Sequence, residues 1–125
     1  MHPPRFYIRA MRYLILSALL ATPAFADPSV IENVSARQTG ETWRFDVTIR
    51  HPDTGWDHYA DGWRVLDMNG QELGMRVLHH PHETEQPFTR SLSGVVIPEG
   101  VGQVQIQARC NVDGWNSDAT VVTLE

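Results

Sequence analysis

Residues 43–49 alternate apolar and polar side chains without a break, and this pattern constrains the fold more than any other feature of the sequence. The apolar members share one parity: Trp43, Phe45, Val47 and Ile49. Successive side chains of a β-strand point to opposite faces of its sheet. The pattern therefore predicts a strand with one face against a core and the other against water.

Other segments have the alternation or the residue types of strands and are separated by turn-forming residues. They are residues 30–36, 63–68, 71–78, 88–97, 103–110 and 119–124. Asn69-Gly70 predicts a two-residue hairpin turn in which both residues take positive φ. Between residues 27 and 125 no window of about eleven residues or more has helical periodicity. We therefore predict an all-β, immunoglobulin-like sandwich of about seven antiparallel strands, with Trp63 in its core.

The first 26 residues have the features of a secretory signal peptide. A charged start at Met11-Arg12 precedes an apolar run at 14–21, and Ala24-Phe25-Ala26 has the form of a cleavage site. The run is shorter than the roughly 20 residues that span a bilayer. We expect cleavage after Ala26, whether translation starts at Met1 or Met11. The product is one domain, residues 27–125, that is periplasmic or secreted and has no membrane span.

The net charge and the cysteine content limit the classes of partner and the covalent links that this domain can have. The whole chain has a formal net charge of −5, and the leader carries three arginines and no acid, so its removal leaves −8. This sign argues against nucleic acid and anionic membranes and is compatible with cations. Cys110 is the only cysteine, which excludes an intrachain disulfide. It is a buried small apolar residue, an intermolecular half-cystine or a metal ligand.

Five histidines follow residue 26, and all lie in or beside two predicted loops: His51, His58, His79, His80 and His82. Antiparallel pairing of residues 63–68 with 71–78 places residue 63 near residue 76, so both loops leave the sandwich at one end. Imidazoles that converge there with carboxylates would form a site for zinc, copper or iron. The alternative is that they are solvated loop histidines without a metal.

Three short motifs resemble the iron domain of superoxide reductases, the desulfoferrodoxin and neelaredoxin family. They are His51-Pro52, then His58-Tyr59 with a tryptophan four residues beyond, and Cys110-Asn111-x-x-Gly114 followed by tryptophan. The resemblance implies an immunoglobulin-like sandwich whose ferrous centre has four histidines and one cysteinate. It also implies His51, His58 and Cys110 as ligand positions. Asp113 occupies the position at which the family motif has its last histidine, and an aspartate carboxylate can also ligate iron.

The sequence leaves three functions open. The first is an exported, non-enzymatic β-sandwich that binds a transition metal through its loop histidines, foremost His58 and the cluster at 79–82, with His51 and Cys110 as further candidates. The second is a superoxide-reductase-like redox enzyme with non-haem iron, and the third is an interaction module without metal that binds another exported protein. The candidate metal ligands are His51, His58, His79, His80, His82, Cys110 and Asp113.

Overall fold

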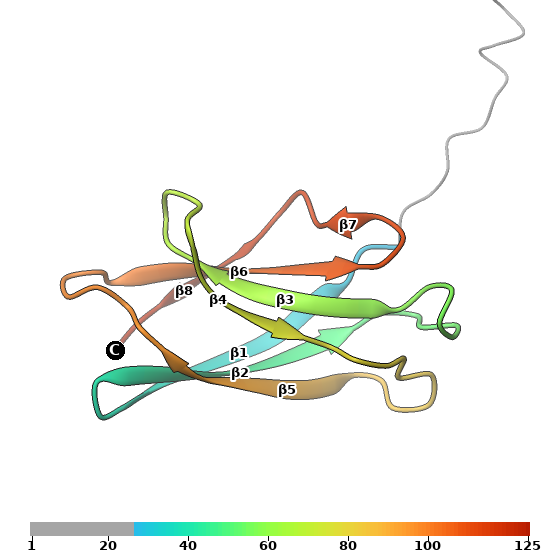
Figure 1. Cartoon of the computed structure of the whole chain (residues 1–125), viewed down its shortest axis with the longest axis horizontal. Helices are drawn as coiled ribbons and strands as arrows, with labels where there is room; N and C mark the ends of the chain where they lie inside the picture. Colours follow the sequence, from blue (N-terminus) through green and yellow to red (C-terminus); the bar gives the residue numbers. More distant parts are fainter. Residues whose placement is uncertain (1–26) are drawn as a thin grey trace, which may run out of the picture.

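The computed structural model describes residues 27–125, so the signal peptide expected at 1–26 lies outside the described residues. This part of the chain consists of strands joined by turns and loops (Figure 1). The strands are β1 (Val30–Thr39), β2 (Thr42–Arg50), β3 (Ala60–Leu66), β4 (Glu72–Val77), β5 (Phe88–Val95), β6 (Gln103–Cys110), β7 (Gly114–Trp115) and β8 (Thr120–Thr123). Among the described residues no helix has the length and apolar character needed to cross a membrane.

The strands form two antiparallel sheets, which confirms the predicted all-β sandwich. One sheet has the order β1-β2-β5, and the other has the order β4-β3-β6-β7, with β8 also paired to β6. The predicted strands correspond to β1–β6 and β8. The additional strand, β7, lies in a segment expected to be a loop and pairs with the end of β6.

The core lies between the sheets and contains the alternate side chains of β2 and β6 that point inward. Phe45 on β2, Ile106 on β6 and Trp63 on β3 are all fully buried. Burying a large apolar side chain contributes on the order of 1.5–3 kcal/mol, so these three residues are major contributors to the stability of the sandwich. Cys110 is on the inward parity of β6 and is 1% exposed.

The β3–β4 hairpin has the predicted pairing but a different turn. Trp63 pairs with Arg76, as expected. Asp67 N donates to Gln71 O, and Gly70 N donates to Asp67 O. Gly70 has φ 88°, but Asn69 does not have a positive φ, nor does any other non-glycine residue between 27 and 125. The prediction of a two-residue turn with positive φ at both residues was therefore wrong. The Asp67 carboxylate accepts the N–H groups of Asn69 and Gln71 and stabilises a longer loop.

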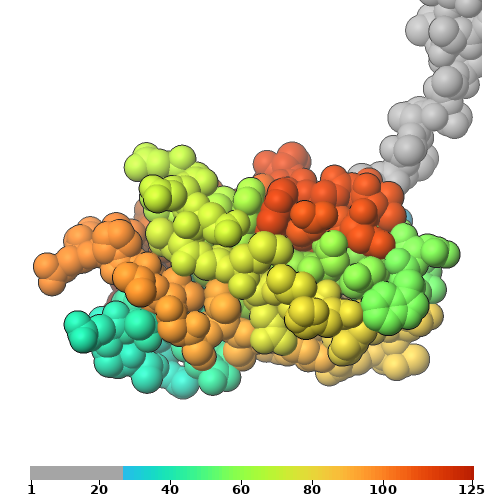
Figure 2. Space-filling view, in the orientation of Figure 1, coloured from blue at the N-terminus to red at the C-terminus, as the bar shows by residue number. Residues whose placement is uncertain are grey.

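Three loops meet at one end of the sandwich: residues 51–59, 78–87 and 111–113. Leu78 N donates to Asp61 O, and Asn111 N donates to Tyr59 O. Figure 1 shows the loops at the end opposite the β3–β4 turn, and Figure 2 shows their side chains covering that end together. The chemically dense segments of the sequence are therefore neighbours in space.

Candidate metal centre

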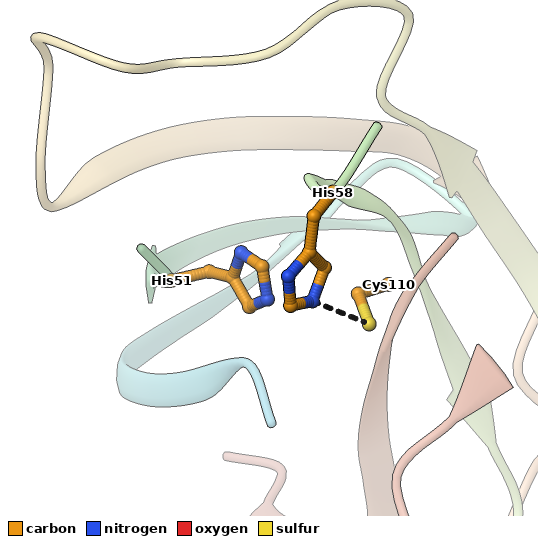
Figure 3. Close-up of side chains that lie close together, drawn as sticks. All are labelled: His51, His58 and Cys110. Atoms are coloured by element: carbon orange, nitrogen blue, oxygen red, sulfur yellow. Dashed lines mark hydrogen bonds between the residues drawn. The ribbon is translucent and has the colours of Figure 1, made fainter. Parts of the chain in front are cut away.

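Three potential metal ligands converge where these loops meet. His51, His58 and Cys110 each offer one ligand atom, and these atoms lie within 4.8 Å of one another. The two imidazoles meet edge to face with their centroids 4.8 Å apart, and His58 Nε2 lies 3.6 Å from Cys110 Sγ. Figure 3 shows both rings directed toward each other, with the cysteine sulfur beside His58.

The two sheets each contribute to this cluster. His51 directly follows β2, continues its inward parity and is fully buried. Cys110 is the last residue of β6 in the other sheet. His58 lies between them on a tight turn, in which Thr54 N donates to His58 O and Gly55 has φ 137°. Glycine adopts this backbone conformation without steric cost, which allows the loop to fold back and present His58.

A buried carboxylate orients His51. Asp53 Oδ1 accepts hydrogen bonds from His51 Nδ1 at 2.6 Å and from Ala60 N at 3.0 Å, and Oδ2 accepts one from His82 N at 2.8 Å. Because His51 donates through Nδ1, its neutral ring carries a lone pair on Nε2. That atom is buried and has no hydrogen-bond partner among the described residues. Carboxylate–histidine pairs of this kind hold metal-ligating imidazoles in many proteins.

The turn after β6 surrounds the cysteine sulfur with polar groups. Asp113 N donates to Cys110 Sγ at 3.3 Å, and the thiol donates to Asp113 Oδ2 at 3.5 Å. Burial raises the pKa of the Cys110 thiol, against the opposing effect of the backbone hydrogen bonds from Asp113 and Val112. The raised pKa therefore keeps the sulfur protonated at neutral pH.

Asn111 joins the loop that carries His58 to the turn that carries Cys110. Its side-chain oxygen accepts from Tyr59 N at 2.9 Å, and its Nδ2 donates to Trp56 O at 3.0 Å and to Asp57 O at 3.3 Å. These bonds hold the two loops in register and so keep His58 beside Cys110.

The other predicted ligands lie outside the three-residue cluster. His79 and His80 are exposed, and Asp113, also exposed, lies beside the cluster through its contacts with Cys110. His82 is buried, stacks on Phe88 with centroids 3.9 Å apart, and accepts a hydrogen bond from Arg90 at Nε2. Burial, followed by the charge of Arg90, lowers the pKa of His82.

Asp53 and Asn111 support the site, but the sequence alone did not predict a supporting role for either residue. Asp53 follows His51 by two residues, so strand parity could have placed both side chains on one side. Asn111 belongs to a motif that was noted, but its bonds to the 56–59 segment depend on a contact between loops distant in sequence.

Comparison with known proteins identifies one relative by sequence and two solved structures with a similar fold. No family model matches the chain. A protein of Halomicrobium mukohataei described as "Putative lipoprotein" is 36% identical over 99 residues, which are 79% of this chain. The match covers 48% of that relative, so the chain spans about half of its length.

Two solved structures share the architecture. A hypothetical protein of Pyrococcus horikoshii has a TM-score of 0.53 at 14% identity, over 88% of this chain and 99% of its own. Superoxide reductase in the oxidized state has a TM-score of 0.51 at 17% identity, over 84% of this chain and 94% of its own. The resemblance to the superoxide reductase domain is thus confirmed at the level of the fold.

Proposed function

We propose that the domain binds a transition-metal ion through His51, His58 and Cys110. The observation that carries the proposal is the Nε2 atom of His51, which is buried without a partner while Nδ1 is held by Asp53. A buried polar atom left unsatisfied costs about 1–3 kcal/mol. A metal ion bound between this nitrogen, the second imidazole and the thiolate would remove that cost.

The donor atoms indicate the class of metal. Imidazole nitrogen and thiolate sulfur suit zinc, copper and iron, whereas calcium and magnesium take oxygen ligands. A bound ion of this class would supply Lewis acidity or, for iron and copper, one-electron chemistry. The chain's own contribution is the buried Asp53, which orients one imidazole, and Asn111, which fixes the spacing of the other two donors.

We further propose that the protein acts outside the cytoplasm. Residues 1–26 have the sequence features of a signal peptide, and residues 27–125 would then be the mature domain, periplasmic or secreted. The description of the relative as a lipoprotein supports export of this chain as well.

The test is metal analysis of protein purified without an affinity tag and then reconstituted with zinc, copper or iron. We expect one bound ion per chain, loss of the ion in His58→Ala, and retention in His80→Ala, a matched variant in which an exposed histidine is removed. Negligible metal in all three proteins would contradict the proposal and favour the interaction module. Equal metal in all three would contradict the assigned ligands.

A superoxide-reductase-like redox enzyme is the second candidate. It is favoured because the three positions that the family motif nominates are the three that converge, on a fold shared with superoxide reductase. Iron-loaded protein should then show a thiolate-to-iron charge-transfer band that disappears in Cys110→Ser, together with consumption of superoxide. An iron-loaded sample without this band would rule the candidate out.

A further inference from the structure

We infer that Arg76 and Trp63 form a binding site for a small oxyanion, a carboxylate or phosphate group, where the edges of β4 and β5 meet. The site is separate from the candidate metal centre and does not depend on it. Two donors carry the inference: Arg76 Nε and Trp63 Nε1 are both buried and have no hydrogen-bond partner among the described residues.

The strand register places these two donors on one face. Trp63 on β3 and Arg76 on β4 are directly opposed in the antiparallel pair, so their Cβ atoms are about 4.5–5.5 Å apart on the same side. That side is the interior, because Trp63 is fully buried. Gly74, two residues before Arg76, has the same orientation, since a Cβ there would contact the side chains of Leu92 and Val95 on β5.

Arg76 lies where the two sheets meet without pairing. β4 and β5 are edge strands of different sheets, and Figure 1 shows them side by side. Arg76 Nη1 donates to Ser91 O at 2.9 Å from one edge to the other. The residue is only half-buried, so part of its side chain is accessible to solvent between the two edges.

The guanidinium of Arg76 retains a pair of donors that suits an oxyanion. Nη1 is the terminal nitrogen on the Cδ side, so its bond to Ser91 O uses one edge of the planar group. The opposite edge carries the parallel N–H groups of Nε and Nη2. Such a fork matches two oxygens of one carboxylate or phosphate.

Arg76 also lacks a counter-ion. None of the ion pairs among residues 27–125 includes it. Arg90 gives the contrast, because it pairs with the buried Val47 and so also points inward, but it donates to His82 Nε2 and to Glu85 Oε1. A partly buried charge without a partner is costly, so an anion bound at Arg76 would stabilise the folded domain.

A charge that points inward from an edge strand can also serve to prevent edge-to-edge pairing of sheets. That role requires only the charge of Arg76, and it leaves the buried N–H group of Trp63 without an explanation. A bound oxyanion accounts for both residues, because it neutralises the guanidinium and offers oxygens to the fork and to the indole.

Titration of metal-free, ¹⁵N-labelled protein tests the site at an identified atom. The chain has four tryptophans, and the indole N–H signal that is missing from the NMR spectrum of Trp63→Phe belongs to Trp63. Inorganic phosphate or acetate at constant ionic strength should shift this signal to saturation, and the two titrations show which class of oxyanion the site prefers. Chloride, which has no pair of oxygens for the fork, should leave it in place.

Two arginine variants locate the anion. Arg76→Lys keeps the charge but loses the fork, so saturation should require at least about 10-fold more oxyanion. Arg37→Lys, which changes an exposed arginine on β1, should titrate like the unaltered protein.

The inference is overturned if neither phosphate nor acetate shifts the Trp63 signal, or if chloride shifts it equally. Equal titration of Arg76→Lys and the unaltered protein would overturn the role of the fork. Because the protein is free of metal in every titration, each of these outcomes is independent of the proposed metal binding.

Discussion

His51 Nδ1 donates a hydrogen bond of 2.6 Å to Asp53 Oδ1, and both side chains are fully buried. The pair lies between the core and the loops, and the same carboxylate also accepts the backbone N–H groups of Ala60 and His82. One anion thus fixes the orientation of a candidate ligand and the positions of two chain segments that enclose it.

Asp53→Asn is expected to weaken both functions of this anion. The amide replaces one acceptor oxygen with a donor, so the N–H group of His82 or of Ala60 loses its partner. We expect the free energy of unfolding to fall by about 1–3 kcal/mol and metal affinity to fall by about 10- to 100-fold. Urea unfolding and chelator competition measure the two effects. Asp57→Asn, an exposed change in the same loop, should alter neither, and a normal affinity in Asp53→Asn would show that His51 needs no orienting partner.

Asn111→Ala should loosen the contact between the His58 loop and the turn that carries Cys110. It leaves the N–H group of Tyr59 and the carbonyls of Trp56 and Asp57 without their side-chain partners. These bonds are exposed, so water can replace the lost partners and each bond contributes only its net value of about 0.5–1.5 kcal/mol. Thermal unfolding checks this against Asn33→Ala, an exposed asparagine on β1. Equal stability of the two variants would contradict the role of Asn111.

Gly55→Ala tests whether the tight turn presents His58. Space is available for a methyl group, but φ of 137° is strained for alanine. Such strain costs on the order of 1–3 kcal/mol, and its relief would move His58, so metal affinity should fall. Gly102→Ala is the matched control, because that glycine also has open space and no positive φ. Identical metal affinity in both variants would argue against the turn's role.

His82 should make the domain less stable in mild acid. Burial is the main cause that lowers its pKa below the usual 6.5, with further lowering by Arg90 and His80 and opposition from Asp53 and Glu85. Below about pH 6.5 the unfolded chain therefore binds more protons at this residue than the folded chain. This contribution to stability is complete above that pH and is lost as the pH falls.

His82→Gln should flatten this part of the pH dependence, measured as urea midpoints between about pH 7 and pH 5. His80→Gln, which removes an exposed histidine, should retain the slope of the unaltered protein. If His82→Gln keeps the full slope, other groups must account for the acid sensitivity.

The fold could be predicted from the sequence because its main signals are local. The alternation of β2 and β6 defines their buried faces, and antiparallel pairing was enough to place Trp63 opposite Arg76. The β3–β4 turn was not predicted, because its length depends on the Asp67 side chain bonding to backbone that follows it. The preference of Asn-Gly for a two-residue turn does not reveal that the Asp67 side chain stabilises a longer loop instead.

The candidate site could be predicted only in part for a similar reason. The resemblance to the superoxide reductase motifs implied His51, His58 and Cys110, and the structure brings these three together, whereas the 79–82 histidines that loop geometry favoured lie outside the cluster. The roles of Asp53 and His82 depend on bonds across the meeting point of loops, and on the stacking of His82 against Phe88. Such contacts follow from the packing of the whole sandwich.

His51 directly follows β2, and Cys110 is the last residue of β6, an interior strand of the opposite sheet. An ion held by both side chains would therefore be a cross-link between the two layers, in the manner of the inter-sheet disulfide of antibody domains. Stability would then depend on the free metal concentration, since a ligand that binds only the folded state stabilises it by mass action. Although the chain has a single cysteine and cannot form an intrachain disulfide, the metal ion would connect its two sheets as a disulfide does. A chelator would remove this connection, whereas a reductant would not.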